Sequence, residues 1–95
     1  MIHPNYKSWI TAYLKSISPR SPEGMCGAAV AAMVMEFPEL KPVSGYVDVD
    51  GEEWLRPHWW AVDPRGTIVD PTAVQFKHIK EYVEPPTAYL RSVGR

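Results

Sequence analysis

The most informative part of the chain is the run His58-Trp59-Trp60-Ala61-Val62-Asp63-Pro64-Arg65-Gly66-Thr67-Ile68-Val69-Asp70. Two apolar segments flank a short turn that has Asp, Pro and Gly at its first, second and fourth positions. This order is typical of a type I turn whose glycine takes the left-handed bulge position. The run therefore predicts a β-hairpin, with Asp63 capping the turn through nearby backbone groups.

The register of this hairpin determines which polar side chains share a face of the sheet. A three-residue loop, Pro64 to Gly66, predicts the pairs Asp63 with Thr67, Val62 with Ile68, Ala61 with Val69, and Trp60 with Asp70. His58 and Asp70 are then diagonal neighbours on one face, with Cβ atoms about 7 Å apart. A two-residue loop would place them on opposite faces.

Two amphipathic helices are predicted before the hairpin. The first runs from Tyr6 to Ile17, with Asn5 as its N-cap, because apolar residues recur at helical spacing. These residues are Tyr6, Trp9, Ile10, Tyr13, Leu14 and Ile17. The second runs from about Met25 to Phe37, and its start is open between Pro22 and Met25. Its apolar stripe consists of Cys26, Ala29, Val30, Met33, Val34 and Phe37.

Beyond the second helix the apolar period changes from helical spacing to two. Alternation from Val43 to Val49 predicts a half-buried strand that ends at the Asp50-Gly51 turn. Residues 75–83 fit either a helical turn or an irregular sheet edge. The expected organisation is a single domain over residues 1–95. It has an N-terminal helix within 1–20, a core over 22–76 and a tail of unassigned structure over 77–95.

Composition excludes several classes of protein. Ninety-five residues, 45% hydrophobic and 22% charged, suffice for one globular core and argue against a disordered chain. A formal net charge of −1 argues against a dedicated nucleic-acid binder. No apolar run reaches the roughly 18 residues of a membrane span, and the N-terminus resembles neither a signal nor a transit peptide. The single cysteine, Cys26, excludes an internal disulfide, so a reducing, cytoplasmic setting is expected. Self-association stays open.

Cys26, His58 and Asp70 together suggest nucleophilic chemistry. A cysteine at the start of a helix lies where unpaired N–H groups and the helix dipole favour the thiolate. An imidazole that accepts its proton and a carboxylate that orients the imidazole would complete a nucleophilic site. Backbone N–H groups at the same helix start are candidate oxyanion donors.

The same residues resemble a known family. Gly24-Met25-Cys26-Gly27 before a helix, the His58-x-Trp60 pattern and Asp70-Pro71-Thr72 resemble the transglutaminase-like branch of the papain-like cysteine hydrolase superfamily. Residues 58–76 also resemble small bacterial and phage proteins of this type. The resemblance implies an α+β fold, with N-terminal helices packed on a three- or four-stranded antiparallel sheet. It also implies Cys26 as nucleophile, His58 as general base and Asp70 as its orienter, with no cofactor.

Two departures from the family pattern bear on the site. The chain is shorter than most family members, and the papain-like glutamine upstream of the nucleophile is absent, since Gln75 is the only glutamine. A side-chain oxyanion donor is therefore unassigned, with Trp9, Tyr6 and Asn5 as candidates.

The expected function is a peptidase, amidase or deamidase that acts on a protein or peptide through a thioester, with Trp59, Trp60 and Trp9 binding substrate. Because Trp59 and Trp60 are adjacent in a strand, one is expected inside the core and the other along a cleft or an interface. Each site residue also has a structural interpretation: Cys26 as a buried apolar residue, His58 as an ordinary strand residue and Asp70 as a turn initiator. Zinc binding by these three is another alternative.

A binding module without catalytic activity, such as a phage-encoded inhibitor of a host protein, is the alternative function. It would act through a tryptophan-rich surface, because Trp and Tyr dominate binding hot spots. His3 and His78 are expected to be ordinary surface residues.

Overall fold

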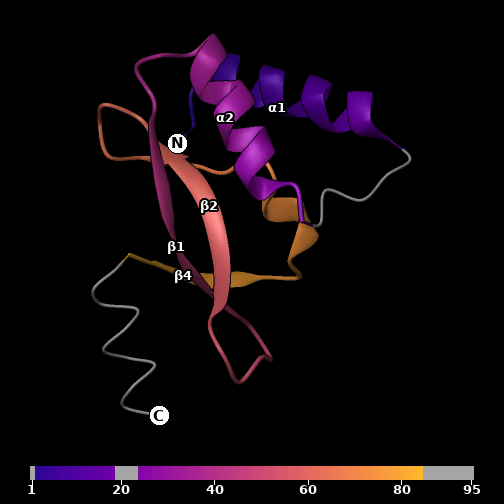
Figure 1. Cartoon of the computed structure of the whole chain (residues 1–95), viewed down its shortest axis with the longest axis vertical. Coiled ribbons are helices and arrows are strands. Elements are labelled where there is room, and N and C mark those ends of the chain that lie inside the picture. The colour runs from indigo at the N-terminus through magenta and orange to yellow at the C-terminus, as the bar shows by residue number, and fades with distance from the viewer. Residues whose placement is uncertain (1, 19–23, 85–95) are drawn as a thin grey trace.

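The protein is an α+β fold in which two helices pack on a curled, four-stranded antiparallel sheet (Figure 1). The computed structural model describes residues 2–18 and 24–84. The elements are α1 (Pro4–Ile17), α2 (Cys26–Glu36), β1 (Lys41–Val49), β2 (Arg56–Val62), β3 (Ile68–Val69), the 3₁₀ turn η1 (Ala73–Gln75) and β4 (Ile79–Val83). The strand order is β3-β2-β1-β4. Within the described residues, no helix is long and apolar enough to cross a membrane.

Both predicted helices are present, with small differences at their starts. α1 begins at Pro4, a favourable first helical residue, and its N-cap is His3 rather than the expected Asn5. The Nδ1 atom of His3 accepts a hydrogen bond from the Asn5 backbone N–H at 3.1 Å. α2 begins at Cys26 with Met25 in the N-cap position. The expected start signal at residues 21–23 lies outside the described residues.

The predicted register of the 58–70 hairpin is confirmed. Ala61 pairs with Val69 and Val62 with Ile68. The Gly66 N–H donates to the Asp63 carbonyl at 2.9 Å, and Gly66 has φ of 83°, the left-handed conformation that the turn requires. Asp63 Oδ1 accepts from the N–H groups of Arg65 and Thr67, which is the expected capping role.

The region expected to be an unassigned tail contributes to the sheet, which corrects that expectation for residues 79–83. β4 pairs antiparallel with β1, with Tyr46 opposite Val83 and Val47 opposite Tyr82. Of the two alternatives for residues 75–83, the sheet edge is found at β4, whereas η1 overlaps this range only at Gln75. The remainder of the tail, residues 85–95, lies outside the described residues.

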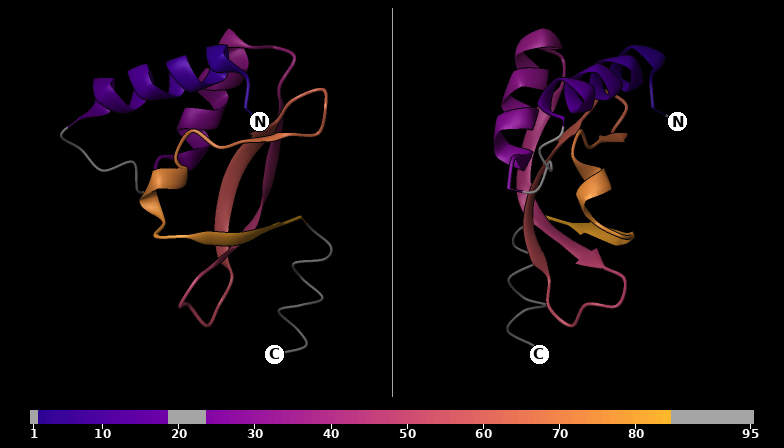
Figure 2. Two further views of the ribbon diagram at one scale, coloured as in Figure 1. Left: turned by 180° about the vertical axis from the view of Figure 1, so that it is seen from behind. Right: turned by 90° about the vertical axis from the view of Figure 1, so that its right-hand side faces the viewer.

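Each face of the sheet carries its own hydrophobic cluster. On one face α2 packs against Ala61 and Val69; that cluster comprises Tyr6, Val30, Met33, Leu40, Ala61 and Val69. On the other face Trp60 packs with Phe76; that cluster comprises Val47, Val49, Trp60 and Phe76. The right-hand view of Figure 2 shows α2 on one side of β2, with η1 and β4 on the other. The curl of the sheet thus produces a second, smaller core that the helices do not cover.

A hydrogen bond ties α1 to the loop between α2 and β1. The Tyr6 hydroxyl donates to Glu39 Oε2 at 2.6 Å. This bond, with burial and the nearby charges of Glu39 and Asp63, raises the pKa of Tyr6 to about 12. The same bond lowers the pKa of Glu39. Both shifts favour the protonated phenol beside the ionised carboxylate in the folded state.

Tyr6→Phe is expected to reduce the free energy of unfolding by an amount that depends on pH. Glu39 has a lowered pKa when folded, so its contribution is present above the unfolded pKa of about 4.3 and is lost as pH falls below it. Tyr6 has a raised pKa, so its contribution is complete below about pH 10 and is lost as pH rises towards 12. Urea unfolding measured from about pH 3 to about pH 11 tests this pH dependence.

The difference between the wild type and Tyr6→Phe should be constant in the middle of that range and shrink at both ends. Tyr13→Phe is the matched control on the same helix, because Tyr13 stacks on Trp9 and no carboxylate is paired with its ring. A wild-type advantage that did not change with pH would contradict the assignment.

Candidate active site

His58 lies within the second core, on strand β2. Its side chain is fully buried. The imidazole meets the Phe76 ring edge-on, with ring centroids 4.9 Å apart, and stacks at 6.2 Å on Trp60. These two aromatic contacts hold the imidazole plane in a single orientation.

Asp70 follows β3 and faces His58, as the hairpin register predicts. His58 Nε2 lies 2.7 Å from Asp70 Oδ2. The same oxygen accepts a bond from the Tyr82 hydroxyl at 2.8 Å, and Oδ1 accepts from the Thr72 N–H at 3.1 Å. The side chain of Asp70 is only 4% exposed, so three donors stabilise a carboxylate that water scarcely reaches.

These bonds leave one nitrogen of His58 without a partner. An ionised carboxylate only accepts hydrogen bonds, so Nε2 carries the proton that joins the two groups. In the neutral imidazole Nδ1 then presents a lone pair. Nδ1 is buried and has no hydrogen-bond partner among the described residues. Nδ1 is therefore a buried proton acceptor to which no donor is bonded.

Cys26 is the first residue of α2 and is half-buried. Its neighbour Gly27 faces the indole of Trp59, the residue after His58: a Cβ placed on Gly27 would lie 3.5 Å from Trp59 Cδ1. Met25 makes no capping bond with its side chain, so the first turn of α2 keeps its backbone N–H groups uncapped by that residue. The first turn of the helix therefore lies against β2 at Trp59.

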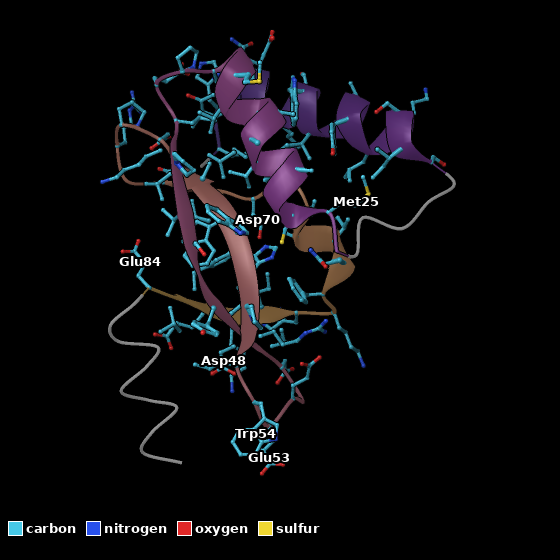
Figure 3. The ribbon with its side chains drawn as sticks, in the orientation of Figure 1. Met25, Asp48, Glu53, Trp54, Asp70 and Glu84 are labelled. Atoms are coloured by element: carbon cyan, nitrogen blue, oxygen red, sulfur yellow. The ribbon has the colours of Figure 1, made fainter. Side chains whose placement is uncertain are left out.

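The structure brings His58 and Asp70 into contact, whereas no hydrogen bond joins Cys26 to His58. α2 packs on the sheet face that carries Ala61, and His58 faces the other side with Trp60. β3 covers β2 only at Ala61 and Val62, so β2 is unpaired on that side at His58. The start of α2 and η1 flank this open edge in Figures 1 and 2. Figure 3 shows Met25 and Asp70 at the same level of the molecule.

The three tryptophans expected to bind substrate have different environments. Trp60 is 1% exposed and belongs to the core, which corrects its expected role as a binding residue. Trp59 is 41% exposed and lines an apolar groove of about 350 Å³ beside α2. Trp9 is half-buried and stacks on Tyr13. The expectation that one of the adjacent pair packs inside and the other lines a cleft agrees with this placement.

The other candidates from the sequence are also placed. His3 and His78 are exposed, as expected. Two of the side-chain candidates for the oxyanion donor are placed as follows. The Tyr6 hydroxyl donates to Glu39, and Asn5 is exposed on α1. Within residues 2–18 and 24–84, no group of three or more His, Cys, Asp or Glu side chains is arranged to hold a metal ion. The zinc alternative therefore has no support from the geometry.

Three residues of this site were not predicted from the sequence. Tyr82 and Thr72 donate to Asp70, and Phe76 contacts His58. The Asp-Pro-Thr run carried a signal for Thr72, because an aspartate commonly bonds to the backbone two residues on. Tyr82 carried none, since its strand pairs with β1, more than thirty residues earlier in the chain.

The comparisons with known proteins returned no match. No protein-family model, curated protein or solved structure matches this chain.

Proposed function

We propose that the protein is a cysteine-nucleophile acyl-transfer enzyme that hydrolyses an amide or ester bond through a thioester on Cys26. The observation that carries this proposal is the buried His58–Asp70 bond at 2.7 Å, which leaves Nδ1 of the imidazole as an unpartnered base. A purely structural histidine in a core would gain stability from bonding both nitrogens. The unpartnered Nδ1 therefore supports a role for His58 as a proton acceptor.

The reaction would follow from this geometry in two steps. The Cys26 sulfur attacks the substrate carbonyl carbon, His58 Nδ1 accepts the thiol proton, and Asp70 stabilises the resulting imidazolium. The proton then passes to the departing amine or alkoxide as its bond to carbon breaks, leaving a thioester. Water attacks the thioester, Nδ1 accepts its proton and returns it to the sulfur, and a carboxylic acid leaves.

Backbone N–H groups in the first turn of α2 are the oxyanion donors that best fit this reaction. They belong to the same helix start as Cys26, and Met25 does not cap them with its side chain. The proposal requires the Cys26 side chain to meet Nδ1 past the open edge of β2. We propose hydrolysis rather than crosslinking as the outcome of the reaction.

The test is formation of an acyl adduct with p-nitrophenyl acetate, followed by intact-mass spectrometry. The chain contains one cysteine, so Cys26→Ala removes every thiol and is an unambiguous control. We expect a burst of nitrophenolate, one acetyl group on Cys26, and slower release of acetate. Acetylation of the wild type at the rate of a free thiol, with no turnover, would count against the enzyme.

The alternative, a binding module without catalytic activity, is favoured by one observation. The groove between α2 and β1–β2 is lined by Gly27, Val30, Ala31, Val34, Pro42 and Trp59, none of them charged. Such an apolar surface with an exposed indole suits contact with another protein. Full biological effect of Cys26→Ala, together with loss of that effect in Trp59→Ala, would establish this function in place of catalysis.

A further inference from the structure

Tyr82 shares a single carboxylate oxygen with His58. Its hydroxyl donates to Asp70 Oδ2 at 2.8 Å, and His58 Nε2 lies 2.7 Å from the same atom. The Tyr82 ring meets Trp60 edge-on at 5.0 Å, so the phenol is held from its apolar side as well. β4, which carries Tyr82, lies on the same side of β2 as η1 (Figure 2).

The phenol acts only as a donor in this arrangement. Burial, then the charge of Asp70, then the hydrogen bond to Asp70 raise the pKa of Tyr82 far above its ordinary value. The hydroxyl therefore stays protonated throughout the pH range of enzymes. Because the carboxylate cannot donate in return, the proton of Tyr82 points at Oδ2 at all times.

We propose that Tyr82 is a positioning residue of the site: its hydroxyl orients the Asp70 carboxylate and moderates how strongly that carboxylate holds a proton on His58. This role rests on the proposed function. Two donors at one oxygen share its negative charge, so each bond is weaker than it would be alone. Tyr82 thus keeps His58 able to release the proton that it accepts, which the second half of an acyl transfer requires.

Among the described residues, Asp70 bonds to the imidazole, and Arg56 lies on β2 itself with its guanidinium over the Phe76 ring at 5.0 Å. Cys26 begins α2, which packs on the opposite face of the sheet. Arg56 also pairs with Glu52 at 3.4 Å. The Phe76 ring contacts both Arg56 and His58. Tyr82→Phe removes one donor from the Asp70 carboxylate and leaves its bonds to His58 and to the Thr72 N–H in place.

The test follows the ring signals of His58 by NMR as a function of pH in the wild type and in Tyr82→Phe. The chain has three histidines, and His3→Ala and His78→Ala variants assign the signals. Removing the hydroxyl leaves Oδ2 with one donor and concentrates its charge on His58. We expect the midpoint of the His58 titration to move to higher pH by about 0.5 to 1 unit. The acid limb of Cys26 acylation, on which the neutral imidazole is lost, should move in the same direction.

Tyr46→Phe is the matched control, since Tyr46 is a half-buried tyrosine of the same sheet that pairs with Val83. It should leave the His58 midpoint unchanged. If Tyr82→Phe loses stability but keeps the wild-type midpoint of the His58 signals, the hydroxyl is merely structural and the positioning role is overturned. In that case, loss of acylation in His58→Ala would still uphold the proposed function. Conversely, acylation that is indifferent to His58 would overturn the function, and the positioning role with it.

Discussion

Replacing His58 with alanine is expected to lower the rate of Cys26 acylation by p-nitrophenyl acetate about 1,000-fold near neutral pH, within the span that general-base catalysis contributes. Nδ1 of His58 is the buried nitrogen without a hydrogen-bond partner, and it is the base of the proposed reaction. Without it, the reaction depends on the fraction of thiol that ionises unaided. Stopped-flow release of nitrophenolate measures the effect.

The matched control is His78→Ala, because His78 is exposed and lies outside the site. That variant should acylate at the wild-type rate. A His58→Ala variant within about threefold of the wild type would contradict the assignment of His58 as the base, since general acid–base groups contribute far more than this.

The alanine variant also loses a buried hydrogen bond, so its fold needs a separate check. Asp70 would keep Tyr82 and Thr72 as donors, and the expected cost is about 2 kcal/mol. Circular dichroism and urea unfolding establish whether the variant is folded. Asp70→Asn serves as a second variant. If its NH₂ group faces His58, Nε2 accepts from it and the imidazole proton moves to Nδ1, which is then no longer a base; if the NH₂ group faces the Thr72 N–H, that bond is lost. Acylation should fall in this variant as well.

Trp60→Ala is expected to lower the free energy of unfolding by about 3–5 kcal/mol, the usual cost of emptying a buried aromatic site. Trp60 is the largest of the fully buried side chains and is the centre of the second core. A domain of this size has a total stability of only about 5–14 kcal/mol, so the variant should unfold at a much lower urea concentration than the wild type.

A close packing contact explains why the cavity would not collapse easily. A Cβ on Gly45 would lie 2.6 Å from the Trp60 ring and 2.7 Å from the Val83 carbonyl oxygen. The backbone of β1 thus already touches both the indole and β4, and the curl of the sheet depends on a residue without a side chain at this point. Removal of the indole leaves a void bordered by backbone that cannot move inward.

Trp54→Ala is the matched control for this experiment. Trp54 is 61% exposed at the end of the β1–β2 hairpin, far from the helices, as Figure 3 shows with its neighbour Glu53. Its loss should cost less than about 1 kcal/mol, as for other surface positions. A cost for Trp60→Ala as small as that of Trp54→Ala would contradict the second core.

The His58–Asp70 pair of the candidate site could be predicted from the sequence, because the pair depends on one local turn. Asp63, Pro64 and Gly66 determine the length of the loop, the loop determines the register, and the register puts His58 and Asp70 on one face. None of these steps involves a contact between distant parts of the chain. The approach of Cys26 to His58 does involve such a contact, and it remains part of the proposal.

The alternation of apolar residues also could not assign the two tryptophans. Period two requires Trp59 and Trp60 to face opposite sides, and that holds. Which of them enters the core depends on how far the sheet curls and on the strand that closes over it, neither of which periodicity reports.

Helical spacing, turn chemistry and strand alternation, each an interaction among residues close along the chain, were enough to establish two helices, the hairpin and the His58–Asp70 pair. The position of β4 beside β1, the choice of Trp60 for the interior and the hydroxyl of Tyr82 on Asp70 became known only from the folded chain. The pairing of β4 with β1 and the bond from Tyr82 to Asp70 join segments that are far apart along the chain. Their free energy comes from the packing of whole elements against one another, for which no short stretch of residues carries a signal.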